Sequence, residues 1–141
     1  MNIRRPQERL ADCCWLGRFI DKARLFISEE LPKDYAPFFC DRRAMDGTFL
    51  RFFKLSKETF VEAVRSSAGD DRLVEEWFLA QPTVTKERID KWNKLAPDIG
   101  RPGNLGCEIL EWAKEHVYTS YPNPEGASAF EVMDLDEGRH L

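Results

Sequence analysis

The chain has 141 residues, of which 43% are hydrophobic, and it includes four tryptophans and ten phenylalanines. So many large aromatic side chains require burial, which excludes disorder for most of the chain, and one core is expected at this length. The net charge of -4 gives no general attraction for nucleic acid or anionic lipid, so nucleic-acid binding is disfavoured.

The balance of charge differs between two parts of the chain. The first 54 residues hold 11 basic and 8 acidic side chains, whereas the remaining residues hold 10 and 17. Internal complementarity between a basic part and an acidic part is the simplest interpretation. A basic face that receives an anionic ligand or an acidic protein partner is the alternative.

No segment approaches the ~20 apolar residues of a membrane span, and Arg4, Arg5 and Arg9 interrupt any apolar secretory signal. We therefore expect a cytoplasmic protein with no membrane partner. Its cysteines should be reduced there, and their spacing fits neither a disulfide framework nor a zinc knuckle. The residues expected to be small buried hydrophobes are Cys13, Cys14, Cys40 and Cys107.

The first predicted element is a helix from about Trp15 to Leu31. At ~100° per residue its apolar side chains fall within an arc of about 160°, opposite a polar face. Pro32 is expected to end the helix because proline lacks an N–H donor and restricts the residue before it. The apolar arc contains Trp15, Leu16, Phe19, Ile20, Ala23, Phe26, Ile27 and Leu31.

The second predicted helix has two possible starts. Asp41 is the expected N-cap of a helix that reaches Lys54, but Gly47 weakens this assignment, and Asp46 capping a shorter helix is the alternative. One side of the helix is apolar in both cases. That side carries Met45, Phe49, Phe52 and Phe53.

Polar residues mark the starts of the next three helices. The expected N-caps are Ser56, Asp70 and Thr85. The first of these helices should end near Gly69 and the third before Pro97. Their core-facing residues are predicted to be Phe60, Val61, Val64, Ala68, Leu73, Val74, Trp77, Phe78, Ile89, Trp92 and Leu95.

Two further helices are predicted after a loop rich in glycine and proline. Asn104 is the expected N-cap of the sixth helix, and Ala127 to Leu135 is expected to be a short helix docked by Phe130 and Met133. The inner side of the sixth helix is predicted to carry Leu105, Ile109, Trp112, Ala113 and Val117.

These elements predict an all-α fold, a compact orthogonal bundle of six or seven short helices. We expect one domain over residues 1–141, with a core of about 6–121 and a docked C-terminal extension, 122–141, that has an acidic end. No strand pattern of useful length is present.

The clearest candidate for a site is the charged side of the first helix. Spacing places Lys22 and Arg24 at opposite margins of the apolar arc, with Asp21 in the middle of the polar side. Arg18 shares a side with Lys22. These side chains could pair with one another and cover the edge of the core. Alternatively, the cations form a rim that binds a carboxylate or phosphate.

Three segments of the sequence resemble an uncharacterised family of small bacterial proteins, one of the domains of unknown function. These segments are Leu16–Arg24, the helix around Trp77, and Ile89–Asn93. The resemblance covers about residues 6–96, and Phe130–Arg139 shows a weaker similarity. The most specific motif is the Asp-Lys-x-Arg sequence on the first helix. The resemblance implies a cytoplasmic helical domain and brings no activity, cofactor or catalytic residue. It directs attention to Arg18, Asp21, Lys22 and Arg24.

Two adjacent cysteines invite a redox or metal interpretation. If Cys13 and Cys14 are helical, their side chains diverge by ~100° and cannot chelate one ion. Arg18 could activate a nearby thiol, but a packed thiol is the simpler interpretation.

Three other patterns also have simple interpretations. The run Asp134–His140 begins like a calcium loop but lacks its later ligands, so we expect a solvated acidic tail. His116 suits a helix C-terminus and has no catalytic triad around it. Glu75 and Glu76 stand where a DNA-recognition helix needs basic or amide side chains.

Six amphipathic helices without assembled catalytic residues favour a non-enzymatic interaction or regulatory module with an unknown protein partner. The alternative is a binding protein or enzyme for a small anionic ligand, a phosphate or carboxylate, held by the cationic rim. The sequence identifies no cofactor, metal ligand or catalytic residue and leaves open whether a reaction is catalysed. The candidate ligand-binding residues are Arg18, Asp21, Lys22, Arg24, Trp92 and Asn93.

Overall fold

The computed structural model describes residues 3–116 and 126–138, and within them it contains seven α-helices and one small two-stranded sheet. The all-α prediction is therefore confirmed. Among the described helices, none combines the length and apolar character that a bilayer crossing requires. The helices are α1 (Leu16–Ile27), α2 (Met45–Phe53), α3 (Lys57–Ser66), α4 (Asp71–Leu79), α5 (Lys86–Leu95), α6 (Cys107–His116) and α7 (Ala129–Asp136).

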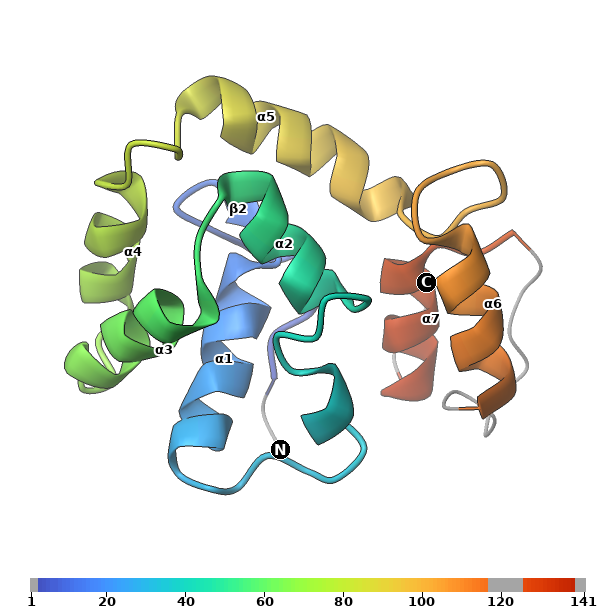
Figure 1. Ribbon diagram of the computed structural model, residues 1–141, viewed down its shortest axis with the longest axis horizontal. Coiled ribbons are helices and arrows are strands. Elements are labelled where there is room, and N and C mark those ends of the chain that lie inside the picture. Colours follow the sequence, from blue (N-terminus) through green and yellow to red (C-terminus); the bar gives the residue numbers. More distant parts are fainter. Residues whose placement is uncertain (1–2, 117–125, 139–141) are drawn as a thin grey trace.

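Short elements connect these helices. Figure 1 shows α3, α4 and α5 curving around one side of α1 and α2, with α6 and α7 beyond the other side. Two 3-10 helices, η1 (Ala36–Phe38) and η2 (Ala96–Asp98), lie in the connections before α2 and after α5. The strands β1 (Arg9–Leu10) and β2 (Cys13–Cys14) form an antiparallel hairpin before α1. Two residues per strand are too few to give an alternating sequence pattern.

The three polar N-caps predicted for α3, α4 and α5 are confirmed. Ser56 Oγ accepts a hydrogen bond from the amide of Thr59, and Thr85 Oγ1 accepts one from the amide of Arg88. The Asp70 carboxylate accepts a hydrogen bond from the amide of Arg72. Each bond satisfies an N–H that has no partner inside the helix, so a local signal is sufficient to set these three starts.

The end of α1 differs from its prediction. The helix ends at Ile27, four residues before the expected Leu31. Glu29 has a left-handed backbone with φ of 60°, and the amide of Glu30 donates to the carbonyl of Leu25 at 2.8 Å. This is the Schellman motif, which satisfies the last carbonyls of the helix and reverses the direction of the chain. The helix therefore ends upstream of Pro32, and the proline is not what ends it.

The start of α2 also differs, because neither Asp41 nor Asp46 is its N-cap. Ala44 holds that position without a side-chain bond, and Asp46 lies in the first helical turn. The Asp41 carboxylate instead accepts from the amide of Arg43 at 2.8 Å. Gly47 permits a close approach of the chain, since a Cβ atom there would lie 2.1 Å from the Asp41 carbonyl oxygen.

Of the inner side predicted for α6, Ala113 is buried as expected, but three other residues are not. The helix begins at Cys107 and not directly after Asn104, and Leu105, Ile109 and Trp112 are exposed. Leu110 and Ala113 are the buried residues, while Val117 lies outside the described residues. Three other residues predicted to face the core, Ala68, Leu73 and Leu95, are exposed as well, and so is Phe26 of the apolar arc of α1.

Aromatic side chains from several helices form the core. Phe19 of α1 stacks on Phe60 of α3 with ring centroids 4.0 Å apart, and Phe49 of α2 meets Trp92 of α5 edge-on at 5.3 Å. Such arrangements bury large areas and suit the charge distribution of the rings. The same hydrophobic cluster reaches Phe130 of α7. The division into a core and a C-terminal extension stays a prediction, since 117–125 and 139–141 lie outside the described residues.

Candidate functional site

A pocket of about 450 Å³ is lined by α1, α2 and the segment around η1 on one side and by α6 and α7 on the other. Pockets of this size accept small molecules. Its lining mixes apolar side chains with charged ones. We name its buried part, formed by Trp15, Arg18 and Lys22, the pocket floor.

A buried ion pair lies at the pocket floor. Lys22 is 4% exposed, and its Nζ lies 2.7 Å from Oδ2 of Asp46, which is fully buried. Asp46 also accepts hydrogen bonds from Trp15 Nε1 at 3.0 Å and from the amide of Cys40 at 3.2 Å. Its place in the first turn of α2 puts the carboxylate at the positive end of the helix dipole, so its negative charge is well compensated.

The Lys22 ammonium has spare hydrogen-bonding capacity. An ammonium carries three N–H donors, and Asp46 is its one hydrogen-bond acceptor among the residues that the structure describes. Its Nζ also lies 5.4 Å from the centroid of the Trp15 ring, a favourable cation–π position. Lys22 is also one of the residues that line the pocket.

A second buried ion pair joins the pocket floor to the end of α7. Arg18 is 2% exposed, and its two terminal nitrogens lie 3.0 and 2.5 Å from the two carboxylate oxygens of Glu137. The Tyr35 hydroxyl donates to the same carboxylate at 2.9 Å. Burial and the charge of Glu137 raise the pKa of Tyr35, so its hydroxyl stays protonated and remains a donor. These bonds hold α7 against α1.

Two more carboxylates lie near this second ion pair. Asp34 and Asp136 both line the pocket, and we name them the acidic region. Burial raises the pKa of Asp136, with further contributions from the charges of Glu137 and Asp34, while Arg18 acts in the opposite direction. No ion pair or hydrogen bond joins Asp34 or Asp136 to another side chain within the described residues.

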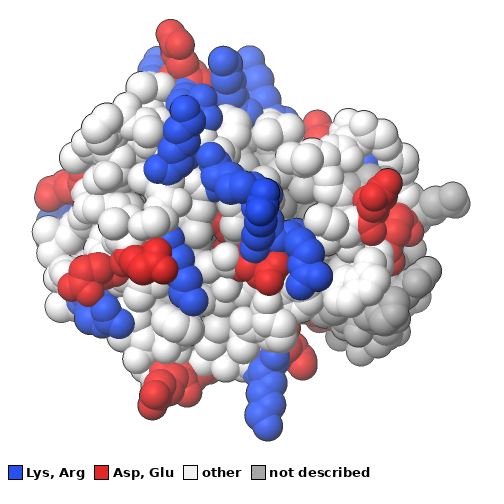
Figure 2. Space-filling view, in the orientation of Figure 1, with Lys and Arg blue, Asp and Glu red and all other residues white. Residues whose placement is uncertain are grey.

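Arginines outnumber the one carboxylate, Asp41, on the side of the pocket formed by α2 and the turn before it, whereas the side formed by α6 is apolar apart from Glu108. Arg43 and Arg51, which we name the arginine rim, line the first side, and Figure 2 shows Lys and Arg side chains gathered over α2 and the turn before it. Leu105, Ile109 and Trp112 line the second side and are 58%, 42% and 48% exposed. The pocket therefore offers cations and an apolar surface to the same ligand.

The four charged residues predicted as one rim on α1 fall into two groups. Arg18 and Lys22 line the pocket, and both are buried in ion pairs instead of forming an open rim. Asp21 and Arg24 belong to a separate network outside the pocket. Arg4 bridges the carboxylates of Asp21 and Asp71 at 2.9 Å each, and the latter also pairs with Arg24 at 2.7 Å.

The other two candidate residues, Trp92 and Asn93, lie away from the pocket and hold the hairpin. Trp92 is buried, and its Nε1 donates to the carbonyl of Cys14 at 2.9 Å. The Asn93 side chain accepts from the amide of Cys14 at 2.9 Å and donates to the carbonyl of Asp12 at 2.8 Å. These bonds satisfy backbone groups of a very short sheet, which is a structural role.

Sequence reasoning missed Trp15, Asp46 and Glu137 as site residues. Asp46 is 24 positions from Lys22, and Glu137 is 119 positions from Arg18. Helical periodicity relates only residues a few positions apart, so it gives no signal for these contacts. Helical spacing places Trp15 in the apolar arc, which agrees with its buried ring but gives no indication of the hydrogen bond that its indole N–H donates to Asp46.

The cysteines that the structure describes are free thiols. Cys13 and Cys14 are buried in β2, which agrees with their expected packed role, although they are not helical. Burial raises the pKa of the Cys14 thiol to about 11 and that of Cys40 to about 12, so both are protonated and weakly nucleophilic at neutral pH. In the described residues no three His, Cys, Asp or Glu side chains are grouped as metal ligands.

The expectation of a solvated acidic tail is wrong for Asp134. This carboxylate is buried and accepts hydrogen bonds from Arg5 at 2.8 Å and Gln7 at 2.6 Å. It belongs to α7, so the beginning of the calcium-like run is helical. The side chain of His116 and residue His140 lie outside the described residues.

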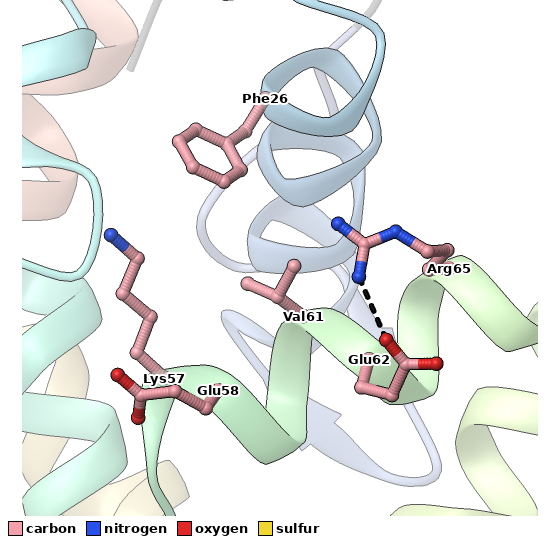
Figure 3. Close-up of a pocket in the computed structure, with 6 residues that line it drawn as sticks. All are labelled: Phe26, Lys57, Glu58, Val61, Glu62 and Arg65. Carbon is pink, nitrogen blue, oxygen red and sulfur yellow. Dashed lines mark hydrogen bonds and ion pairs between the residues drawn. The ribbon is translucent and has the colours of Figure 1, made fainter.

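A second hollow of about 330 Å³ lies between the end of α1 and α3 (Figure 3). Phe26 and Val61 face it, Lys57 lies over the Phe26 ring at 5.0 Å, and Arg65 pairs with Glu62 at 2.7 Å. Most of its lining is exposed surface, and no buried charged group contributes to it. The pocket between α2 and α6 is therefore the stronger candidate.

These observations define a class of small helical protein with buried ion pairs under a pocket of mixed polarity. The chain belongs to the family named Domain of unknown function (DUF5069), whose match covers residues 1–139. This confirms the resemblance and extends it beyond residues 6–96. No curated protein matches the chain. Bacterial origin and the Asp-Lys-x-Arg helix as the mark of the family stay predictions.

Proposed function

We propose that this protein binds a small molecule with an anionic group and an apolar body in the pocket between α2 and α6. The observation that carries the proposal is Lys22, a buried ammonium at the pocket floor with one protein acceptor among the described residues. A carboxylate or phosphate oxygen is the natural acceptor for its other N–H groups.

The charges around Lys22 favour an anion over a neutral group. Asp46 balances the charge of Lys22 and Asp41 pairs with Arg43, so Arg51 supplies the excess positive charge on this side. Arg51 donates to the carbonyl of Arg42 and to Thr48 Oγ1, and no carboxylate pairs with it in the part of the chain that the structure describes. Arginine in this setting attracts anions and orients them by its fixed fork of donors.

The apolar part of the ligand would contact α6. Leu105, Ile109 and Trp112 present a continuous set of exposed apolar side chains to the pocket. Each Å² of apolar surface removed from water stabilises a complex by about 25 cal/mol before the cost of association. A ligand with an aliphatic or aromatic body would therefore bind more tightly than inorganic phosphate or acetate.

Isothermal titration calorimetry with octanoate, phenylpropionate and inorganic phosphate tests this proposal. Both organic acids should bind with one site per chain and more tightly than phosphate. Replacing Lys22 by methionine should weaken octanoate binding about 10- to 100-fold, because a charge-assisted hydrogen bond contributes about 1.5–3 kcal/mol.

Two further variants separate binding from folding. Lys22→Met leaves Asp46 buried without its cation, so the double variant Lys22→Met with Asp46→Asn removes both charges, keeps an acceptor oxygen for the Trp15 indole N–H and should retain the fold. Lys57→Met, in the second hollow, is the matched control and should bind octanoate as the unchanged protein does. Absence of binding by both organic acids, or equal loss in the Lys57 variant, would contradict the proposal.

An interaction or regulatory module, the function favoured by sequence alone, is the second candidate. The exposed set of Leu105, Ile109 and Trp112 supports it, since apolar side chains of this size are enriched at protein interfaces. A cytoplasmic location is likewise proposed, supported by the buried free thiols of Cys13 and Cys14. Neither candidate assigns a reaction or a cofactor.

A further inference from the structure

We propose that the ligand carries a second anionic group at the far end of its apolar body, so that one anionic group binds at Lys22 and the other at Arg51. This inference rests on the proposed function and names the class of ligand, a dianion with an apolar chain between its two charges.

The two cations lie at the inner and outer ends of the pocket. Lys22 is 4% exposed at the pocket floor, whereas Arg51, in the last turn of α2, is exposed and lines the same pocket. Lys22 donates to Asp46. Arg51 donates to Thr48 Oγ1. These two acceptors are two positions apart, so their side chains leave the axis of α2 about 160° apart. The cations are therefore held on different sides of the helix, where one carboxylate does not serve both.

Arg51 has unused donors in a fixed position. A guanidinium carries five N–H groups, and Arg51 uses two of them, toward the carbonyl of Arg42 and toward Thr48 Oγ1. These bonds hold the guanidinium against α2, so binding of an anion orders less side chain than it would at a free arginine. Within residues 3–116 and 126–138, no carboxylate takes the other three N–H groups.

The segment around Arg51 carries excess positive charge. Residues 41–54 hold two carboxylates, and both are paired, Asp46 with Lys22 and Asp41 with Arg43 of the arginine rim. Figure 2 shows Lys and Arg side chains gathered over this segment. An anionic group is therefore attracted to it. In the part of the chain that the structure describes, the basic side chains of this segment that pair with no carboxylate are Arg42, Arg51 and Lys54.

The acidic residues of the pocket direct a second anionic group toward Arg51. In the acidic region, Asp34 lies before η1 and Asp136 in α7, whereas Arg51 lies in α2. Like charges repel, so an anionic group is disfavoured beside these two carboxylates. Glu108, in the first turn of α6, is exposed and is screened by water and salt.

The remaining lining suits an apolar chain. The side of α2 that faces the pocket carries Met45, Thr48 and Arg51, spaced three residues apart. Ile109 and Trp112 of α6 line the pocket as well. An apolar chain would cover the apolar members of this lining while its charged ends contact the two cations.

Isothermal titration calorimetry with octanoate, 8-hydroxyoctanoate and suberate tests the inference. The three compounds share one chain and differ only at the end away from the first carboxylate. Suberate should bind about tenfold more tightly than 8-hydroxyoctanoate, about twofold because either end can occupy the site at Lys22 and about fivefold from one exposed ion pair. Octanoate reports the site at Lys22 alone.

Arg51→Gln is the decisive variant. It should lower the preference for suberate over 8-hydroxyoctanoate to about the statistical twofold, whereas Arg51→Lys keeps the charge and should retain a larger preference. The ratio of the two affinities is the readout, because loss of Arg51 also weakens the general attraction for anions. Arg65→Gln, in the second hollow, removes the same charge from an exposed arginine and should leave the ratio unchanged.

The outcomes distinguish this inference from the proposed function. A preference for suberate of about twofold or less in the unchanged protein, or a larger preference that survives Arg51→Gln, would overturn the second anion site and leave the site at Lys22 in place. Absence of octanoate binding would overturn the proposed function itself.

Discussion

Replacing Asp46 by alanine removes the acceptor around which the pocket floor is built. The substitution deletes three hydrogen bonds at once, from Lys22 Nζ, Trp15 Nε1 and the amide of Cys40. It also leaves the Lys22 ammonium buried without its counter-ion. Breaking a buried ion pair by removal of one partner costs about 3–5 kcal/mol, and in a chain of this length such a loss lowers the melting temperature by roughly 10–15 °C.

Urea denaturation followed by far-ultraviolet circular dichroism measures this cost. Glu62→Ala is the matched control, because it removes a carboxylate from an exposed pair with Arg65 on α3 and should cost less than about 0.5 kcal/mol. If Asp46→Ala loses no more free energy of unfolding than Glu62→Ala, Asp46 is not the structural centre of the pocket floor and the argument from its burial is refuted.

Three further substitutions test the packing of α2, the docking of α7 and the burial of Asp136 by the same denaturation assay. Gly47→Ala should cost about 3 kcal/mol, the upper end for overpacking, because the new Cβ meets the rigid backbone of Asp41; wild-type stability would refute the close approach. Phe130→Ala should cost about 3–5 kcal/mol, since this buried ring stacks on Trp15 at 5.7 Å; a loss below about 1 kcal/mol would show that α7 is not docked there. Asp136→Asn should stabilise the protein at pH 7 but not below pH 3.8, the ordinary pKa of the carboxyl, because a carboxyl whose pKa is raised in the folded state destabilises the fold only once it ionises. If the variant and the unchanged protein have the same free energy of unfolding at both pH values, the burial of this group is contradicted.

Features that depend on neighbouring residues could be predicted from the sequence. The N-caps Ser56, Asp70 and Thr85 are examples, because a short polar side chain satisfies an amide two or three residues away. The buried face of α1 around Phe19 and Ile20 is another, since helical spacing alone sets which side chains share a face.

Amphipathic spacing was less informative for α6. The spacing of apolar residues identifies an apolar side of the helix, but it does not predict whether that side packs in the core or lines a pocket. Leu105, Ile109 and Trp112 have the expected spacing and line the pocket, while Leu110 is buried beside Gly100. The boundary of the core is a tertiary property, because it depends on how α6 sits against other helices.

The candidate site could be predicted only in part. The charged pattern on α1 directed attention to Arg18 and Lys22, which do line the pocket. Their partners Asp46 and Glu137 come from other helices, and long-range ion pairs leave no periodic signal in one sequence. The Schellman turn at Glu29 was missed for a different reason, since this position is more often glycine.

We propose that octanoate and related anions bind over Lys22 in the pocket between α2 and α6. The most direct test follows the four indole N–H signals in a nitrogen-15 correlation spectrum during a titration with octanoate. Trp15 and Trp112 line the pocket, whereas Trp77 and Trp92 do not. Binding over Lys22 should give saturable shifts for the first two signals and leave the other two in place. Shifts confined to Trp77 and Trp92, or no shifts at all, would show that octanoate does not bind in this pocket.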